Sequence, residues 1–355
     1  MAERVFRTLL SVLLACATIG VSAAQRPAPA PDLTTRAVAA AEAFLATLDA
    51  GQRARANLAL NESTRTVWSN LPTGIKLQSG VMERNGVKLG RLTPVQDQAA
   101  LALLATVLSR DGFDKTMAIV DADQVLETRS APTRAAAAAI RFGRAEYYIS
   151  ILGKPSATEP WMIQFGGHHL AINVTLAGRH GVLTPTHTGT QPATYSVNGR
   201  TIRPLGDEND KAFALIHALN TDQRRQAILS YEVRNLVLPP GTDGKTIAPD
   251  GARAATFTGA QRALLVELIR EWVDMLGVEA AAAKMKDVQA GLADTYFAWA
   301  GAIENGKGAY FRIHGPALFI EYAPQGGGAT SIDHIHTIYR DPAGDYGVKA
   351  KAVRR

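Results

Sequence analysis

Four of the eight histidines in this 355-residue chain fall into two pairs. His168 and His169 are adjacent in QFGGHHLAIN, whereas His334 and His336 flank one residue in IDHIHTIYRDP. Residues two apart on a β-strand point to the same face, so His334 and His336 can present two imidazoles side by side. Catalytic metal sites typically combine three protein ligands with one open position. The sequence therefore predicts a metal site formed by the second pair and one member of the first.

The sequence does not decide which residue of the first pair, His168 or His169, is the ligand. On a regular strand His168 and His169 would point to opposite faces, so at most one of them is expected to join the site. His187, in the segment TPTHTG, is a reserve ligand. Imidazole ligands do not distinguish zinc from copper or iron, so the metal stays open. The competing interpretation is a set of hydrogen-bonded imidazoles that bind only a polar or anionic ligand.

Two charged residues are candidates for catalysis. Glu321 lies in the apolar segment LFIEYAP, where a lone carboxylate is costly unless it is paired or functional. It is a candidate ligand or general base, and a salt bridge to Arg312 or Arg340 is the structural alternative. Arg340 follows the H-x-H segment directly, and its guanidinium is suited to orienting a carboxylate or phosphate of a substrate.

Two other motifs are incomplete. The segment 241–246, GTDGKT, resembles a phosphate-binding loop, but Pro239 stands where the first glycine belongs and no helix is expected after it. Asp121 and Asp123 begin like a calcium loop, without the later ligands or the glycine. Neither segment supports nucleotide or calcium binding.

The N-terminus has the pattern of a secretory signal peptide. Residues 1–24 combine a basic start, an apolar stretch and small residues that allow cleavage after Ala23 or Ala24. Residues 25–32 are a Pro/Ala-rich linker. We therefore expect an exported protein, periplasmic or secreted.

Lipidation is the alternative form of export. Leu13 to Cys16 resembles a lipobox, in which Cys16 would be lipidated and anchor the protein. Cys16 is the only cysteine, so no disulfide is expected in the folded part. No later segment is apolar enough over sufficient length to predict a transmembrane segment.

The charge pattern argues against nucleic acid as a partner. The formal net charge is +6, but four Lys and Arg residues fall in the last seven positions. Residues 351–355 are expected to be a basic tail, and no basic stripe is interleaved with aromatic residues. The expected partner is a small-molecule ligand or substrate, and the sequence leaves the oligomeric state open.

The helices and strands that must position these residues are predicted to alternate in blocks along the chain. Helices are predicted at 34–58, from Thr93 to Gly112, at 133–140, from Thr258, and at 278–300. Strands are predicted at 147–152, 162–165, 169–176, 309–313, 317–322 and 332–339, with Gly166-Gly167 as a turn or bulge, 181–190 as a loop and 326–328 as a hairpin tip. This order is not a βαβ repeat. We predict an α+β fold, with a single large domain at 33–350 and a mainly antiparallel sheet flanked by helices.

Several strings together resemble the DUF3500 family of uncharacterised bacterial and fungal proteins. They are WSNLP at 68–72, WMIQFGGHHLAIN at 161–173, TPTHTGTQP at 184–192, FAWAG at 297–301, YFRIHGPALFIEY at 310–322 and HIHTIYRDPAGDYG at 334–347. The resemblance implies one domain spanning both histidine pairs and carries no activity. The expected function is a metal-dependent enzyme, either hydrolase or oxidoreductase. The alternative is a non-catalytic binding protein for a metal or a small anion.

Overall fold

A long β-sheet organises the part of the chain that the computed structural model describes, residues 32–78, 80, 81, 83–130, 139–325 and 332–348. Twelve strands of the described residues belong to it, in the order β1-β5-β6-β7-β9-β16-β15-β14-β13-β12, with β4 beside β5 and β8 beside β7. The β1–β5 pair is parallel, and the other pairs of the sheet are antiparallel. The prediction of an α+β domain with a mainly antiparallel sheet is confirmed.

The strands of the sheet come from two parts of the chain. The first part supplies β1 (Asn57–Leu58), β4 (Val87–Lys88), β5 (Tyr148–Leu152), β6 (Trp161–Gly167), β7 (Leu170–Ala177), β8 (His180–Val182) and β9 (Thr186–Thr190). The second supplies β12 (Ala252–Arg253), β13 (Tyr296–Gly301), β14 (Ala309–Gly315), β15 (Leu318–Pro324) and β16 (Ile335–Arg340). Short hairpins outside the sheet are β2 (Lys76–Leu77) with β3 (Gly80–Val81), and β10 (Tyr195–Val197) with β11 (Arg200–Ile202). The sheet joins its two parts where β9 pairs with β16.

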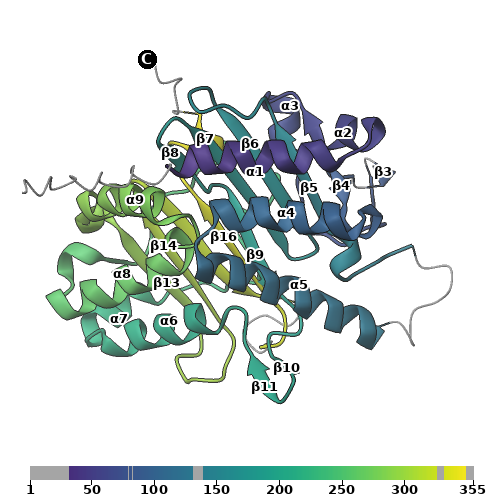
Figure 1. Cartoon of the computed structure of the whole chain (residues 1–355). Helices are drawn as coiled ribbons and strands as arrows, with labels where there is room; N and C mark the ends of the chain where they lie inside the picture. The colour runs from purple at the N-terminus through teal and green to yellow at the C-terminus, as the bar shows by residue number, and fades with distance from the viewer. Residues whose placement is uncertain (1–31, 79, 82, 131–138, 326–331, 349–355) are drawn as a thin grey trace, which may run out of the picture. The chain divides into compact units, whose positions relative to one another are not determined.

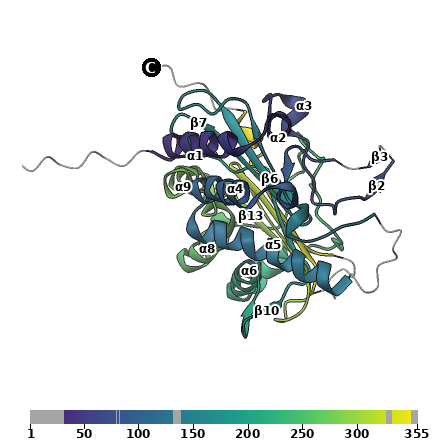
Figure 2. The ribbon, with the colours of Figure 1, turned by 45° about the vertical axis from the view of Figure 1, so that its right-hand side comes forward.

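Helices cover one face of the sheet (Figures 1 and 2). On this face lie α1 (Leu33–Thr47), α4 (Pro94–Val107), α5 (Arg110–Ser130), α6 (Gly206–Ala218), α8 (Gly259–Val273) and α9 (Val278–Ala290). The shorter helices are α2 (Ala50–Ala56), α3 (Glu62–Arg65) and α7 (Thr221–Ala227). The large core cluster combines residues of these helices with apolar strand residues such as Ile172, Phe311 and Ile320.

The opposite sheet face is buried but rich in polar side chains. Strand register places Gln164 opposite Asn173, and His187 opposite Ile338, two residues from His336. Because side chains alternate across a strand, these polar residues share the face that the helices leave free. Burying polar side chains costs free energy, and the fold alone does not require them on this face. The polar face is therefore where a functional site is expected.

Two predicted helix starts are confirmed by their caps. Thr93 and Thr258 are the N-cap residues of α4 and α8, and each forms a capping box, with Gln96 and Gln261 respectively. In each box the threonine side chain accepts from the backbone of the glutamine, which bonds back to the threonine N–H.

Three predicted helix boundaries are wrong. The helix predicted at 34–58 breaks at Asp49, whose side chain caps a new helix, α2. Gly112 does not end α4, which stops at Val107, but lies inside α5, a helix that periodicity did not reveal. The helix predicted at 278–300 ends at Ala290, because the alternating segment YFAWAG forms β13.

Two predicted irregular segments are strands instead. Most of the predicted loop at 181–190 belongs to β8 and β9, and every residue of β9 is buried. Gly166 and Gly167 belong to β6, and the turn falls on His168 and His169. Most of the helix predicted at 133–140 and the hairpin tip at 326–328 lie outside the described residues.

The predicted signal peptide, the first seven residues of the linker and the basic tail also lie outside the described residues. Among the helices that are described, none has the length and apolar character needed to cross a membrane.

Candidate metal centre

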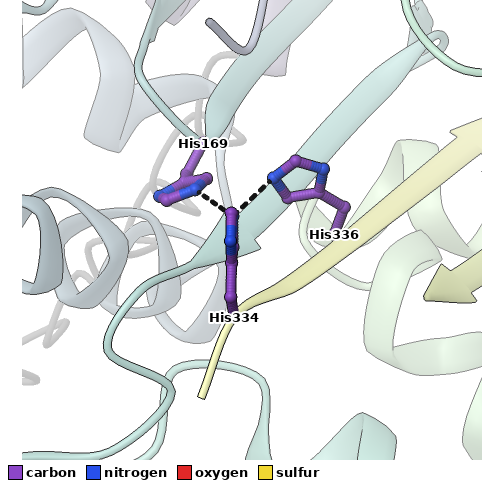
Figure 3. A group of neighbouring side chains, drawn as sticks. All are labelled: His169, His334 and His336. Carbon is purple, nitrogen blue, oxygen red and sulfur yellow. Dashed lines mark hydrogen bonds between the residues drawn. The ribbon is translucent and has the colours of Figure 1, made fainter. Parts of the chain in front are cut away.

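Three imidazoles from both histidine pairs converge on the polar sheet face (Figure 3). Nε2 of His169 lies 2.8 Å from Nε2 of His334, which lies 3.1 Å from Nε2 of His336. The ligand atoms of the three residues all lie within 4.8 Å of one another. The structure thus brings together residues 165 positions apart, as the metal-site hypothesis requires. We call His169, His334 and His336 the imidazole trio.

The spacing of the trio is close to that of imidazoles around one ion. Metal–nitrogen distances of about 2.0–2.1 Å and tetrahedral angles place two ligand nitrogens about 3.3 Å apart and two ring centres about 5 Å apart. The ring centroids of the trio are separated by 4.8, 4.8 and 5.2 Å. The Nε2 atoms of His169 and His336 would each need to move away from Nε2 of His334 by about half an ångström or less to reach this spacing.

Hydrogen bonding alone satisfies the trio poorly. A neutral imidazole has one in-plane lone pair and one N–H, yet Nε2 of His334 faces the Nε2 atoms of both other rings. Burial lowers the pKa of His334 to about 4, and burial together with neighbouring histidines lowers the pKa of His169 and His336 well below the usual value. The rings are therefore neutral at neutral pH and have lone pairs to offer.

The turn between β6 and β7 positions the first pair. His169 has φ of 65°, a left-handed conformation in which histidine is found more often than most residues. Its N–H donates to the carbonyl of Asn70, and the Tyr147 hydroxyl donates to the carbonyl of His168. Gly167 makes room for this tyrosine, since a Cβ there would lie 2.8 Å from its ring. The turn therefore fixes the direction of the His169 ring.

His168 is held by Asp123, a residue that sequence analysis missed as part of this site. Nδ1 of His168 lies 2.7 Å from Oδ1 of Asp123, whose Oδ2 accepts from the N–H of Gly143. The His168 and His169 rings stack with centroids 3.6 Å apart. Alternation along a strand does not apply to this pair, because both residues lie in the turn.

Asp123, His168 and His169 form a second group that could hold a metal. Its geometry is less favourable than that of the trio. The two rings are inclined by only 31°, so their in-plane lone pairs do not meet at one point at a normal metal distance. The 2.7 Å contact between His168 and Asp123 is a hydrogen bond that orients the ring of His168.

Gly189 on β9 leaves the space that the trio occupies. It lies opposite His336 in the strand register. A Cβ at this position would lie 3.0 Å from Cδ2 of His336 and 3.4 Å from Cβ of His169, and also 2.8 Å from the carbonyl of Ile335. The glycine is therefore required by close approach and not by its φ.

His187, the reserve ligand, lies beside the trio. Its ring is fully buried and its centroid is 5.0 Å from that of His336. Neither ring nitrogen has a hydrogen-bond partner among the described residues. Burial lowers its pKa to about 3, and interactions with His168, His334 and Arg340 add to the effect. His187 is thus a neutral imidazole next to the centre but outside the converging group.

Glu321 lies on the same sheet face but bonds elsewhere. Its Oε1 accepts from the N–H of Val237 and the hydroxyl of Tyr310, and its Oε2 accepts from the N–H of Leu238. Burial raises the pKa of Glu321. Its role as ligand or base stays a prediction, and the contacts favour a structural role in holding the segment that covers β15.

Arg340 also bonds to the segment at 237–243 that Glu321 contacts. Its guanidinium donates to the carbonyls of Leu238 and Pro239 and to Oδ1 of Asp243 and Oδ2 of Asp345. It lies four positions after His336 along β16, which corresponds to about 13 Å. Orientation of a substrate at the trio by Arg340 also stays a prediction.

Glu321→Gln gives a direct test of the structural role. A glutamine cannot accept from both backbone N–H groups and the tyrosine, so one buried donor loses its partner. We expect the free energy of unfolding to fall by roughly 1–3 kcal/mol in urea denaturation, with the metal content unchanged. Unchanged stability with lost metal would instead assign Glu321 to the centre.

The fold and site together define an α+β domain that carries a cluster of neutral imidazoles on the polar face of its sheet. Its sequence matches the family model described as "Protein of unknown function (DUF3500)" over residues 31–348. The chain therefore belongs to the DUF3500 family, as its sequence strings predicted. Comparisons with curated proteins and with solved structures gave no match.

Proposed function

We propose that the protein is an exported metal-dependent enzyme whose centre is a single divalent ion bound by His169, His334 and His336. The convergence of three Nε2 atoms from two distant segments carries this proposal. Asp123 holds His168 by a hydrogen bond, and the His168 ring stacks on His169 and orients its ring.

An open coordination position is what such a centre needs for catalysis. His169 is buried, but His334 and His336 are only half-buried, so one side of the trio faces outward. Three protein ligands and an open position suit a Lewis acid or a metal that activates water. Zinc, copper and iron all accept imidazole, so the ligand set supports hydrolytic and redox chemistry alike.

The second candidate is a binding protein that captures a metal or a small anion without turnover. The positions of Glu321 and Arg340 favour it, because both residues proposed for catalysis bond to the segment at 237–243. In this function the same trio would bind the cargo.

Metal analysis of the untagged full chain tests both candidates. We expect about one equivalent of zinc, copper or iron per chain after purification, and less than about a tenth of that after His334→Ala with His336→Ala. The matched control is His180→Ala with His217→Ala, because both of these histidines are exposed. Metal far below one equivalent in the wild type, unaffected by the double change, would remove both metal functions.

Turnover then separates enzyme from binding protein. Metal-dependent hydrolysis or oxidation of a model substrate, lost on removal of the metal by a chelator, supports the enzyme. A tightly held metal without turnover across ester, amide, phosphate and phenol substrates supports the binding protein.

Export is proposed from residues 1–24. N-terminal sequencing of the protein secreted by an expressing cell is expected to start at Ala24 or Gln25. A lipidated Cys16 at the start would support the anchored form, and retention of Met1 would contradict export.

A further inference from the structure

A second candidate site lies on the polar side of the sheet, apart from the imidazole trio. It is a cavity of about 300 Å³ between α3, the segment at 238–247 and the turn that follows β16. None of the clustered imidazole residues lines it. The volume lies at the lower end of the range for small-molecule pockets.

The carboxylates around the cavity are largely committed to partners. Asp243 and Asp345 accept from Arg340, and Asp341 accepts from Lys284 at 2.6 Å. Arg340 is in turn fully occupied by these contacts and by backbone carbonyls. Asp341 is neutralised by Lys284, whereas Asp243 and Asp345 share the single guanidinium of Arg340, so this group keeps one net negative charge that hydrogen bonds hold in place.

The free polar groups in the lining are mostly donors. Nε of Arg65 is buried without a hydrogen-bond partner among the described residues, and its guanidinium lies 5.5 Å from the ring centroid of Tyr346. Lys245 is exposed and forms no ion pair within the described residues. Glu62, in the first turn of α3, is the lining carboxylate that lacks a described cation partner.

The floor of the cavity is apolar. Phe319 and Leu238 are buried beneath it, and Ile247 is half-buried at its side. The ring of His314 packs edge-on against Phe319, 5.2 Å between centroids, and its Nδ1 is buried without a described partner. Burial and the nearby Arg312 lower the pKa of His314, so it adds a neutral polar group.

We propose that this cavity binds a small monocarboxylate with an apolar body. The carboxylate would accept charge-assisted hydrogen bonds from Arg65 and Lys245, for which the described residues offer no such partner. The apolar part would cover Phe319 and Leu238. This site is independent of the metal centre, since it shares no lining residue with the trio.

Benzoate, benzyl alcohol and benzylamine are probes of the same shape and different charge. Each is titrated into the full chain kept metal-free with a chelator, and binding is followed by calorimetry and by the shift in melting temperature. We expect benzoate to bind and to raise the melting temperature, with benzyl alcohol weaker and benzylamine weakest.

Arg65→Gln is expected to weaken benzoate binding about tenfold, and Arg91→Gln, at an exposed arginine outside the cavity, to leave it unchanged. Lys245→Gln gives the same test with an exposed residue if Arg65→Gln does not fold. Equal or tighter binding of benzylamine, no binding of benzoate, or unaltered binding in both variants overturns the proposal. Because metal is absent throughout, these outcomes do not depend on the metal centre.

Discussion

His336→Phe is expected to weaken metal binding by at least about 100-fold. The change removes one of the three proposed ligands and retains a planar ring in the same space. Loss of outer partners of metal ligands costs about 10–100-fold in affinity, so loss of a ligand is expected to cost more. The affinity is measured by competition with a chromophoric chelator for zinc.

His187→Phe is the matched control for this change. Both imidazoles lie on the same sheet face, and their centroids are 5.0 Å apart, but only His336 belongs to the converging trio. We expect the control to keep its metal affinity within about threefold. Its metal-free form should be at least as stable as the wild type, because a buried ring whose two nitrogens have no partner in the described part of the chain is replaced by an apolar one. Equal losses of affinity in both variants would extend the centre to His187, and no loss in either would exclude the trio.

Lys115→Met is expected to lower the free energy of unfolding by about 3–5 kcal/mol. Nζ of Lys115 on α5 donates to Oε1 of Glu208 on α6 at 2.7 Å and to Oε2 of Glu271 on α8 at 2.8 Å. The Glu208 side chain is 1% exposed, so it would be left as a buried carboxylate without its cation. The network also joins three helices of the layer over the sheet.

Lys211→Met supplies the comparison for this network. Lys211 also contacts Glu271, but its side chain is 37% exposed and Glu271 would keep Lys115. We expect a loss below about 1 kcal/mol, as for exposed ion pairs. Urea denaturation of both variants gives the values, and similar losses in the two would show that burial of Glu208 does not set the cost.

The sequence predicted the architecture where local signals were strong. The cap residue Thr93 with the following proline and the capping box at Thr258 located two helix starts, and the strand-like segments located β5, β6, β7, β14, β15 and β16, half of the strands of the sheet. The helix predicted at 278–300 was wrong because α9 ends at Ala290 and the alternating segment YFAWAG forms β13, which pairs with the next strand, β14, and with the more distant β12. Strand pairing of this kind depends on tertiary contacts, so helical propensity alone did not predict it.

The candidate site was predictable in part. The H-x-H spacing indicated His334 and His336 correctly as neighbours, since both side chains lie on one side of the chain entering β16. The choice between His168 and His169 needed the turn, which strand alternation could not describe. Asp123 had a usable signal, because it continues the buried stripe of α5 formed by Thr116, Ile119 and Val120.

X-ray absorption at the metal edge tests the centre most directly. The zinc-loaded full chain is expected to show three nitrogen ligands at about 2.0–2.1 Å, with the outer-shell scattering of imidazole rings. His336→Phe should lose one of these rings. A zinc shell made of oxygen atoms, or with a single imidazole, would contradict the claim that the two histidine segments meet at one ion.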